Sequence, residues 1–248
     1  MIKGDFDDAL AELDTAEVEF AATDDPLGRW RWLLTKISYL RRRSGFPAAR
    51  RLLNEAYKLA QHHPAPAYKA QTHFQHAYIT WLHHGNFQEA ETEFKTAVQL
   101  YEAVNQPLWL AQSFNGLAQI YTNSGRLTET GKILEKARLI YEDADVPSLL
   151  ADNLLDSGRF EMYRGELSVC LQHWHRAKEL HQQLGNKWPS SIISLYEGEV
   201  YLLQKDYQKA LFLFENAHQQ IKNLKLEHRR TICEIRLVLV WLELGNIQ

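Results

Sequence analysis

Residues 81–101 read WLHHGNFQEAETEFKTAVQLY, and this stretch decides the fold. After Gly85, the residues at offsets of two, five, nine and twelve are Phe87, Ala90, Phe94 and Ala97. Residues three and four apart share one face of an α-helix. The stretch therefore predicts a helix that begins just after the glycine and buries this face.

The same pattern recurs along the whole chain every 40 residues, with one interval of 41. The turn position is held by Gly4, Ser44, Gly85, Gly125, Gly165, Lys205 and Gly245. Small residues follow at offset five, at Ala9, Ala49, Ala90, Thr130, Cys170 and Ala210. Alanine follows at offset twelve, at Ala16, Ala56, Ala97, Ala137, Ala177 and Ala217. Larger residues fill offset nine, at Leu13, Leu53, Phe94, Leu134, Trp174 and Phe214. Such a period indicates a solenoid of stacked helical units.

Each unit is predicted to hold a helix A, a short turn and a helix B. Helices B are expected at about 5–21, 46–62, 86–104, 126–143, 166–184 and 206–223, with ends uncertain by a few residues. Helices A are expected at about 28–43, 67–84, 107–124, 148–164, 188–204 and 227–244. Small residues let helix B approach its neighbours closely, and the residue at offset nine fills the space between them.

Capping and helix-breaking residues agree with this frame. Glycine suits the turn because it adopts the left-handed conformation that ends many helices. Asn86, Asp206 and Asn246 are predicted N-caps of the following helices. Proline favours first turns and loops, and the seven prolines are Pro26, Pro47, Pro64, Pro66, Pro107, Pro147 and Pro189.

The composition is that of a folded protein without a nucleic-acid footprint. Of 248 residues, 45% are apolar and 24% charged, and the formal net charge is −3. The two cysteines, Cys170 and Cys233, lie far apart, which favours a reducing compartment and no disulfide. No signal peptide or apolar run of about 20 residues is present. We therefore expect a cytoplasmic protein.

The motifs around three turns resemble the tetratricopeptide repeat. The matching residues are Trp81, Gly85, Phe87, Ala90, Phe94 and Ala97; then Ala118, Tyr121, Gly125, Leu127, Leu134 and Ala137; then Gly198, Tyr201, Tyr207, Ala210, Phe214 and Ala217. The period exceeds the 34 residues of the standard repeat, and Glu161 stands where the family has an aromatic residue. Similar long variants occur in kinesin light chains, Pins-type scaffolds and bacterial STAND regulators.

The resemblance implies an all-α, right-handed superhelical solenoid of antiparallel helix pairs, with about twelve helices in a single domain over 1–248. It also implies a concave groove, lined by helices A, that binds a peptide or partner domain. Family register places these residues in the groove: Arg31, Thr35, Ser38, Arg42, Gln75, His76, Gln112, Asn115, Gln119, Asn123, Asp152, Asp156, Arg159, Tyr163, Tyr196, Glu199 and Arg236. Their alternative role is that of a solvated polar face. The Lys and Asn pattern of the family's carboxylate clamp has no full match.

Both ends of the sequence fall within a repeat, so a fragment of a longer array is expected. Residues 237–244, LVLVWLEL, make the last helix strongly apolar. Self-association through this exposed helix, or docking of a partner there, is the corresponding expectation.

Charge and histidine are unevenly distributed. Residues 1–25 hold nine acidic residues and one lysine, whereas 26–51 hold eight basic residues and no acidic ones. The two segments could neutralise each other, or the basic one could bind an acidic partner. His73 and His76 can share a helix face, but ligand spacing typical of a metal site is missing, so surface histidines are favoured.

No catalytic motif stands out, so an enzyme is not expected, and neither a cofactor nor a metal is predicted. The leading hypothesis is a protein-interaction scaffold. The alternatives are a ligand-sensing region of a multidomain ATPase or transcription regulator, and a structural self-assembly module. Nucleic acid is an unlikely partner at this net charge.

Overall fold

A computed structural model describes residues 6–21, 25–42, 45–62, 65–185, 188–223 and 227–245. These residues form twelve α-helices and contain no strand. The chain divides into two compact units, one over Asp5–Ala144 and the other over Asp145–Gln248. The predicted all-α fold of consecutive helix pairs is confirmed.

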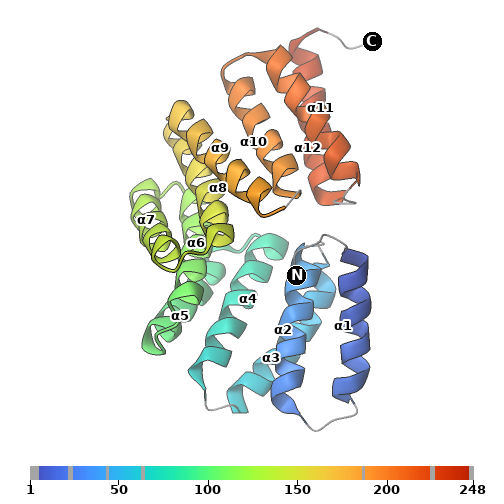
Figure 1. Cartoon of the computed structure of the whole chain (residues 1–248), viewed down its shortest axis with the longest axis vertical. Helices are drawn as coiled ribbons and strands as arrows, with labels where there is room; N and C mark the ends of the chain where they lie inside the picture. Colours follow the sequence, from blue (N-terminus) through green and yellow to red (C-terminus); the bar gives the residue numbers. More distant parts are fainter. Residues whose placement is uncertain are drawn as a thin grey trace. The chain divides into compact units, whose positions relative to one another are not determined.

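The unit Asp5–Ala144 contains seven helices in chain order. They are α1 (Phe6–Ala21), α2 (Pro26–Arg42), α3 (Phe46–His62), α4 (Pro66–His84), α5 (Phe87–Ala103), α6 (Pro107–Asn123) and α7 (Leu127–Asp143). Consecutive helices pack against each other through short turns, and α2 also contacts α4 (Figure 1). Two apolar clusters fill this unit, one centred on Leu33, Ile37 and Leu53 and the other on Phe94 and Tyr101.

The unit Asp145–Gln248 contains five helices. They are α8 (Pro147–Arg164), α9 (Leu167–Gln183), α10 (Trp188–Leu203), α11 (Tyr207–Asn223) and α12 (Glu227–Glu243). Figure 1 shows α10, α11 and α12 next to one another, in agreement with their contacts. One cluster surrounds Trp174 and Leu180, and another surrounds Phe214 and Cys233.

The predicted turn residues adopt the left-handed conformation wherever the structure describes them. Gly85, Gly125, Gly165 and Gly245 have φ between 62° and 82°, and Lys205 stands in for glycine at φ 62°. Gly4 and Ser44 lie outside the described residues. The Asn86 side chain accepts a hydrogen bond from the Glu89 backbone N–H, and Asp206 accepts one from Lys209. Asn246 and Pro64 also lie outside the described residues.

A second series of left-handed residues joins helices B to the next helix A. Asn105, Asp145 and Gly185 have φ values of 51°, 49° and 70° and again follow one another at 40-residue steps. The sequence prediction missed them. Their signal is the residue type, because Asn, Asp and Gly tolerate this conformation better than other residues.

The described small positions of the repeat are interior positions, as predicted, except for Ala16, which is half-buried. Those with no exposure are Ala49, Ala56, Ala90, Ala97, Thr130, Ala137, Cys170, Ala177, Ala210 and Ala217. Cys170 behaves as an alanine substitute, since burial raises the pKa of its thiol to about 12 and keeps it protonated. The described residues contain no helix that is both long and apolar enough to span a membrane.

One face of α12 is apolar and uncovered. Ile235, Val238 and Leu242 are 54%, 49% and 50% exposed. Forty residues earlier, α10 carries Leu195, Gly198 and Leu202, and Leu195 and Gly198 are buried there beneath α11. The exposed face of α12 therefore corresponds to the face of α10 that α11 covers. Self-association through it stays a prediction, which light scattering over a concentration series would check.

Candidate functional site

Predicted site residues of Asp145–Gln248 meet around Tyr196 on α10. The Arg159 guanidinium carbon, on α8, lies 5.8 Å from the centre of the Tyr196 ring. The ring stacks on the buried Trp174 with centroids 5.6 Å apart and an interplanar angle of 29°. Because Trp174 has no exposure, it fixes the position of the half-buried tyrosine.

A second pair joins the next two A helices in the same register. Arg236 on α12 donates a hydrogen bond of 3.0 Å from Nε to Oε1 of Glu199 on α10. Arg236 follows Glu199 by 37 residues, as Tyr196 follows Arg159. The equal separation shows that α8, α10 and α12 align corresponding side chains on one face.

Arg229, which the sequence prediction missed, belongs to the same place. It lies near the start of α12, and its Nη1 donates to the Tyr196 hydroxyl oxygen at 3.3 Å. Arg229 stands seven residues before Arg236, or two helical turns, so periodicity would have put it on the same face. We call Arg159, Tyr196, Glu199, Arg229 and Arg236 the Tyr196 cluster.

Three further predicted residues lie on α8. Asp156 and Tyr163 are close enough to Arg159, together with Tyr196 and Glu199, to raise its pKa, although burial alone would lower it. Arg159 therefore stays charged. Tyr163 is 51% exposed. Asp152 lies 3.7 Å from Nε2 of His181, whose burial lowers its pKa and disfavours the charged ring.

In Asp5–Ala144, two of the predicted residues are interior. Gln75 and Asn115 are only 4% and 6% exposed, so they contribute to packing and do not present an open surface. Their assignment to the groove conflicts with this burial. The reason is that their helix position faces the following helix B, as Leu195 does in α10.

The other predicted residues of this unit are more accessible. Arg31, Thr35 and Asn123 are exposed, and Ser38, Gln112 and Gln119 are half-buried. The Thr35 hydroxyl donates to the Arg31 carbonyl and the Asn123 amide donates to the Gln119 carbonyl, both within their own helices. The side chain of Arg42 lies outside the described residues.

His76 belongs to a hydrogen-bonded cluster with Tyr57, His73 and Glu93. Glu93 on α5 accepts hydrogen bonds from Tyr57 of α3 at 3.0 Å and from Nδ1 of His73 at 2.6 Å. His76 Nδ1 lies 2.9 Å from the Tyr57 hydroxyl and 3.2 Å from Glu93. The expectation of simple surface histidines is therefore wrong for His73 and His76, which link α4 to α3 and α5.

This cluster predicts a loss of stability in acid. Burial would raise the pKa of Glu93, but hydrogen bonds from His73 and His76 outweigh it and lower the pKa from 4.5 to about 2. A lowered folded-state pKa stabilises the fold above about pH 4.5, and this contribution disappears as the pH falls to about 2. The shift corresponds to at most about 3 kcal/mol.

The check is chemical unfolding of the wild type and Glu93→Gln between pH 6 and pH 2. We expect the wild type's advantage in free energy of unfolding to shrink over this range. Arg126 also lowers the pKa of Glu91, but Glu91 is present in both proteins, so its contribution to the pH dependence cancels in the comparison. A difference that does not vary with pH would contradict this assignment.

The uneven charge near the start of the chain is at least partly neutralised by packing. Lys36 on α2 contacts Asp14 and Glu17 on α1 at 2.8 and 2.7 Å. Arg29 pairs with Glu55 on α3. The contacts of Lys36 favour neutralisation of the basic segment by the acidic one, whereas the partner of Arg29 lies outside residues 1–25.

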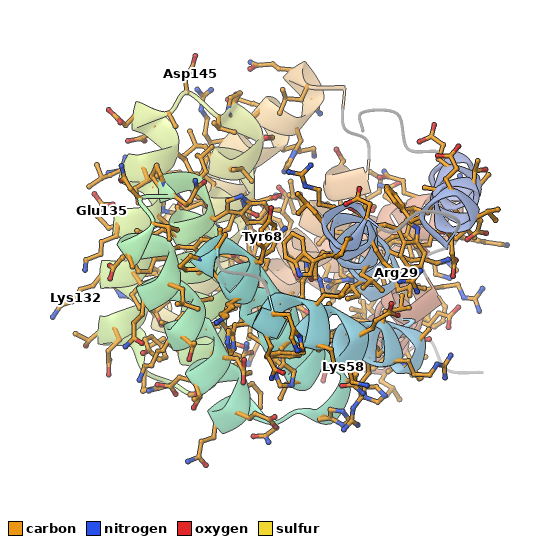
Figure 2. All side chains as sticks on the ribbon, turned by 90° about the horizontal axis from the view of Figure 1, so that it is seen from below. Arg29, Lys58, Tyr68, Lys132, Glu135 and Asp145 are labelled. Atoms are coloured by element: carbon orange, nitrogen blue, oxygen red, sulfur yellow. The ribbon has the colours of Figure 1, made fainter. Side chains whose placement is uncertain are left out.

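The outer faces of helices B differ from the Tyr196 cluster. On α7, Figure 2 shows Lys132 and Glu135 pointing away from the protein, and both are exposed. Glu135 pairs with Arg138 one turn along the same helix. Such exposed pairs within a helix add little stability and are typical of a solvated surface.

The described parts of the chain do not meet the requirements of a metal site, and the pocket around Trp30 does not meet those of a small-molecule site. They contain no group of three or more His, Cys, Asp or Glu residues able to hold a metal ion. One small pocket, lined by Pro26, Leu27, Trp30, Leu59 and Tyr68 (Tyr68 is labelled in Figure 2), has a cavity volume of about 20 Å³. Small-molecule sites usually occupy roughly 300–1,000 Å³.

Comparison with known proteins identifies the fold class. No protein-family model matches the sequence, and no curated protein is similar to it. Solved structures with matching folds include tetratricopeptide-repeat and similar helical-repeat proteins. The chain therefore has the tetratricopeptide-repeat fold that residues 81–101 indicate.

Three of these structures are informative. A Rap protein complexed with competence and sporulation factor matches 94% of this chain and 68% of its own, with TM-score 0.76 and 13% identity. The apo quorum sensor NprR of B. thuringiensis matches 100% and 72%, with TM-score 0.64 and 13% identity. A STAND protein with a tetratricopeptide-repeat sensor, from Pyrococcus horikoshii, matches 97% and 38%, with TM-score 0.60 and 18% identity. At these identities, the likeness shows the fold alone.

Proposed function

We propose that this protein is a non-catalytic interaction module that binds a peptide or an extended segment of a partner protein. Within Asp145–Gln248, the binding surface is the face of α8, α10 and α12 that carries the Tyr196 cluster. The similarity in fold to a Rap protein complexed with competence and sporulation factor supports a binding role.

The observation that carries the proposal is the convergence of polar side chains from three helices on one face. Arg159, Tyr196 and Arg236 come from three different helices, and each contacts a residue of a neighbouring helix A. Their hydrogen-bonding groups are suited to an extended peptide. Tyrosine and arginine are also the residues that most often dominate binding energy at interfaces.

A peptide library displayed on phage tests the proposal. Peptides selected on the full chain should lose at least tenfold affinity for Arg159→Ala/Tyr163→Ala. The matched control is Arg176→Ala/Phe212→Ala, which removes an arginine and an exposed aromatic ring from the outer faces of α9 and α11. Equal losses in both variants, or no loss in the first, would overturn the proposed surface.

A second candidate is the sensor region of a larger regulator. The match covers nearly all of this chain but only 38% of the STAND protein, which has a tetratricopeptide-repeat sensor. Thermal shift measurements with a small-molecule library would support this candidate only if a compound raised Tm and the selected peptides did not.

A further inference from the structure

We infer that the Tyr196 cluster binds an oxyanion of its peptide ligand, a carboxylate or a phosphate group, between the guanidinium groups of Arg159 and Arg229. This inference rests on the proposed function and specifies the chemistry that the site recognises. Arg159 and Arg229 differ from most other arginines of the described residues in having no ion-pair partner there.

Arg159 and Arg229 are half-buried, yet neither forms an ion pair with any described residue. Most other half-buried arginines have a glutamate partner, namely Arg29, Arg126, Arg138, Arg230 and Arg236. Arg41 lies over the ring of Tyr78, 4.2 Å from its centre. Taking a cation out of water without a partner is costly. A pair of such groups on one face is therefore a place where a bound anion would restore the missing interaction.

The nearby carboxylates do not fill this role. Glu199 is engaged by Arg236 at 3.0 Å. Asp156 and Glu199 both act on Arg159 electrostatically, but neither forms an ion pair with it. These acidic groups weaken the attraction for a free anion, so we expect inorganic phosphate to bind at the two arginines more weakly than an acidic peptide does.

The aromatic ring gives the site its geometry. Arg159 approaches the ring of Tyr196 at 5.8 Å, and Arg229 reaches its hydroxyl group at 3.3 Å. Stacking on Trp174 holds the ring in place, so it aligns both arginines before the ligand arrives. A guanidinium group binds carboxylate and phosphate oxygens through two parallel hydrogen bonds, which an ammonium group cannot do.

The first experiment uses peptides selected on the full-length chain. We expect them to be enriched in Asp and Glu, and replacement of the essential acid by its amide should weaken binding at least tenfold. Synthetic peptides with phosphoserine in place of that acid distinguish the two sources of the oxyanion. Weaker binding of phosphoserine than of the acid identifies a carboxylate site, and stronger binding identifies a phosphate site.

Variants of Arg159 and Arg229 test whether these side chains cause the preference for the acidic peptide over the amide peptide. The amide peptide should bind wild type and Arg159→Gln/Arg229→Gln equally, whereas the acidic peptide should discriminate between them at least tenfold. Arg159→Lys should show only part of the wild-type preference, because it keeps the positive charge but loses the planar guanidinium group that forms two parallel hydrogen bonds. Arg176→Gln, an exposed arginine on α9, should leave the preference unchanged.

The outcomes separate this inference from the proposed function. If selected peptides require the Arg159 and Tyr163 face but tolerate loss of every acid, the oxyanion inference is wrong and the proposed function stands. If no peptide depends on that face, the proposed function fails. A titration of the chain with inorganic phosphate, followed by NMR of the arginine Nε–H groups, then decides: selective shifts at Arg159 and Arg229 support the anion site, and their absence rejects it.

Discussion

Replacing Trp174 with alanine is expected to destabilise the unit Asp145–Gln248 by about 3–5 kcal/mol. Trp174 has no exposure, and its indole Nε1 donates a 3.1 Å hydrogen bond to the carbonyl of Leu155. The backbone is shaped around the ring, since a Cβ built at Gly158 would lie 2.2 Å from Nε1. Truncation therefore leaves a cavity that α8 and α9 cannot close without moving.

Thermal unfolding followed by circular dichroism measures this effect. A loss of this size corresponds to a fall in Tm of very roughly 6–20 °C. Trp241→Ala is the matched control, because Trp241 is 39% exposed on α12. Similar losses of Tm in the two variants would contradict the role given to Trp174.

Replacing Ala97 with arginine is expected to cost at least about 3 kcal/mol in the unit Asp5–Ala144. Ala97 has no exposure and lies in the cluster that contains Phe94 and Tyr101. The variant both overpacks the contact and buries a charge without a partner. Urea unfolding at neutral pH measures the change in free energy.

Ala103→Arg provides the control on the same helix. Ala103 is exposed at the end of α5, where a positive charge interacts favourably with the helix dipole. We expect it to keep wild-type stability. If Ala97→Arg unfolded at the same urea concentration as Ala103→Arg, the close packing of small residues would not be what limits stability here.

The helices could be predicted from sequence because the same spacing of turn, small and large residues recurs in successive repeats. Every predicted helix agrees with the structure to within two residues at each end. Offsets from one turn residue fix which side chains are buried, as Phe94, Trp174 and Phe214 show at offset nine. Family register assigned both Arg159 and Tyr196 to the groove, and the Arg159 guanidinium carbon lies 5.8 Å from the centre of the Tyr196 ring. That this face binds a ligand stays a prediction.

Contacts that depend on side chains from several helices were not predictable in this way. Tyr57, His73 and Glu93 meet from three helices, and their bond partners follow from chain geometry that periodicity does not contain. Arg229 was missed because the first groove position of the family register lies later in helix A than Arg229 does. Gln75 was assigned to the groove by family register, whereas its side chain is only 4% exposed, because this helix position faces the following helix B.

The central claim is that the face of α8, α10 and α12 binds the ligand. A selected peptide that carries a photoreactive benzophenone group at its centre, followed by mass spectrometry of the cross-linked chain, tests this claim directly. The account predicts cross-links within α8, α10 and α12, close to Arg159, Tyr196 and Arg229. Cross-links confined to the outer faces of α9 and α11 would contradict it.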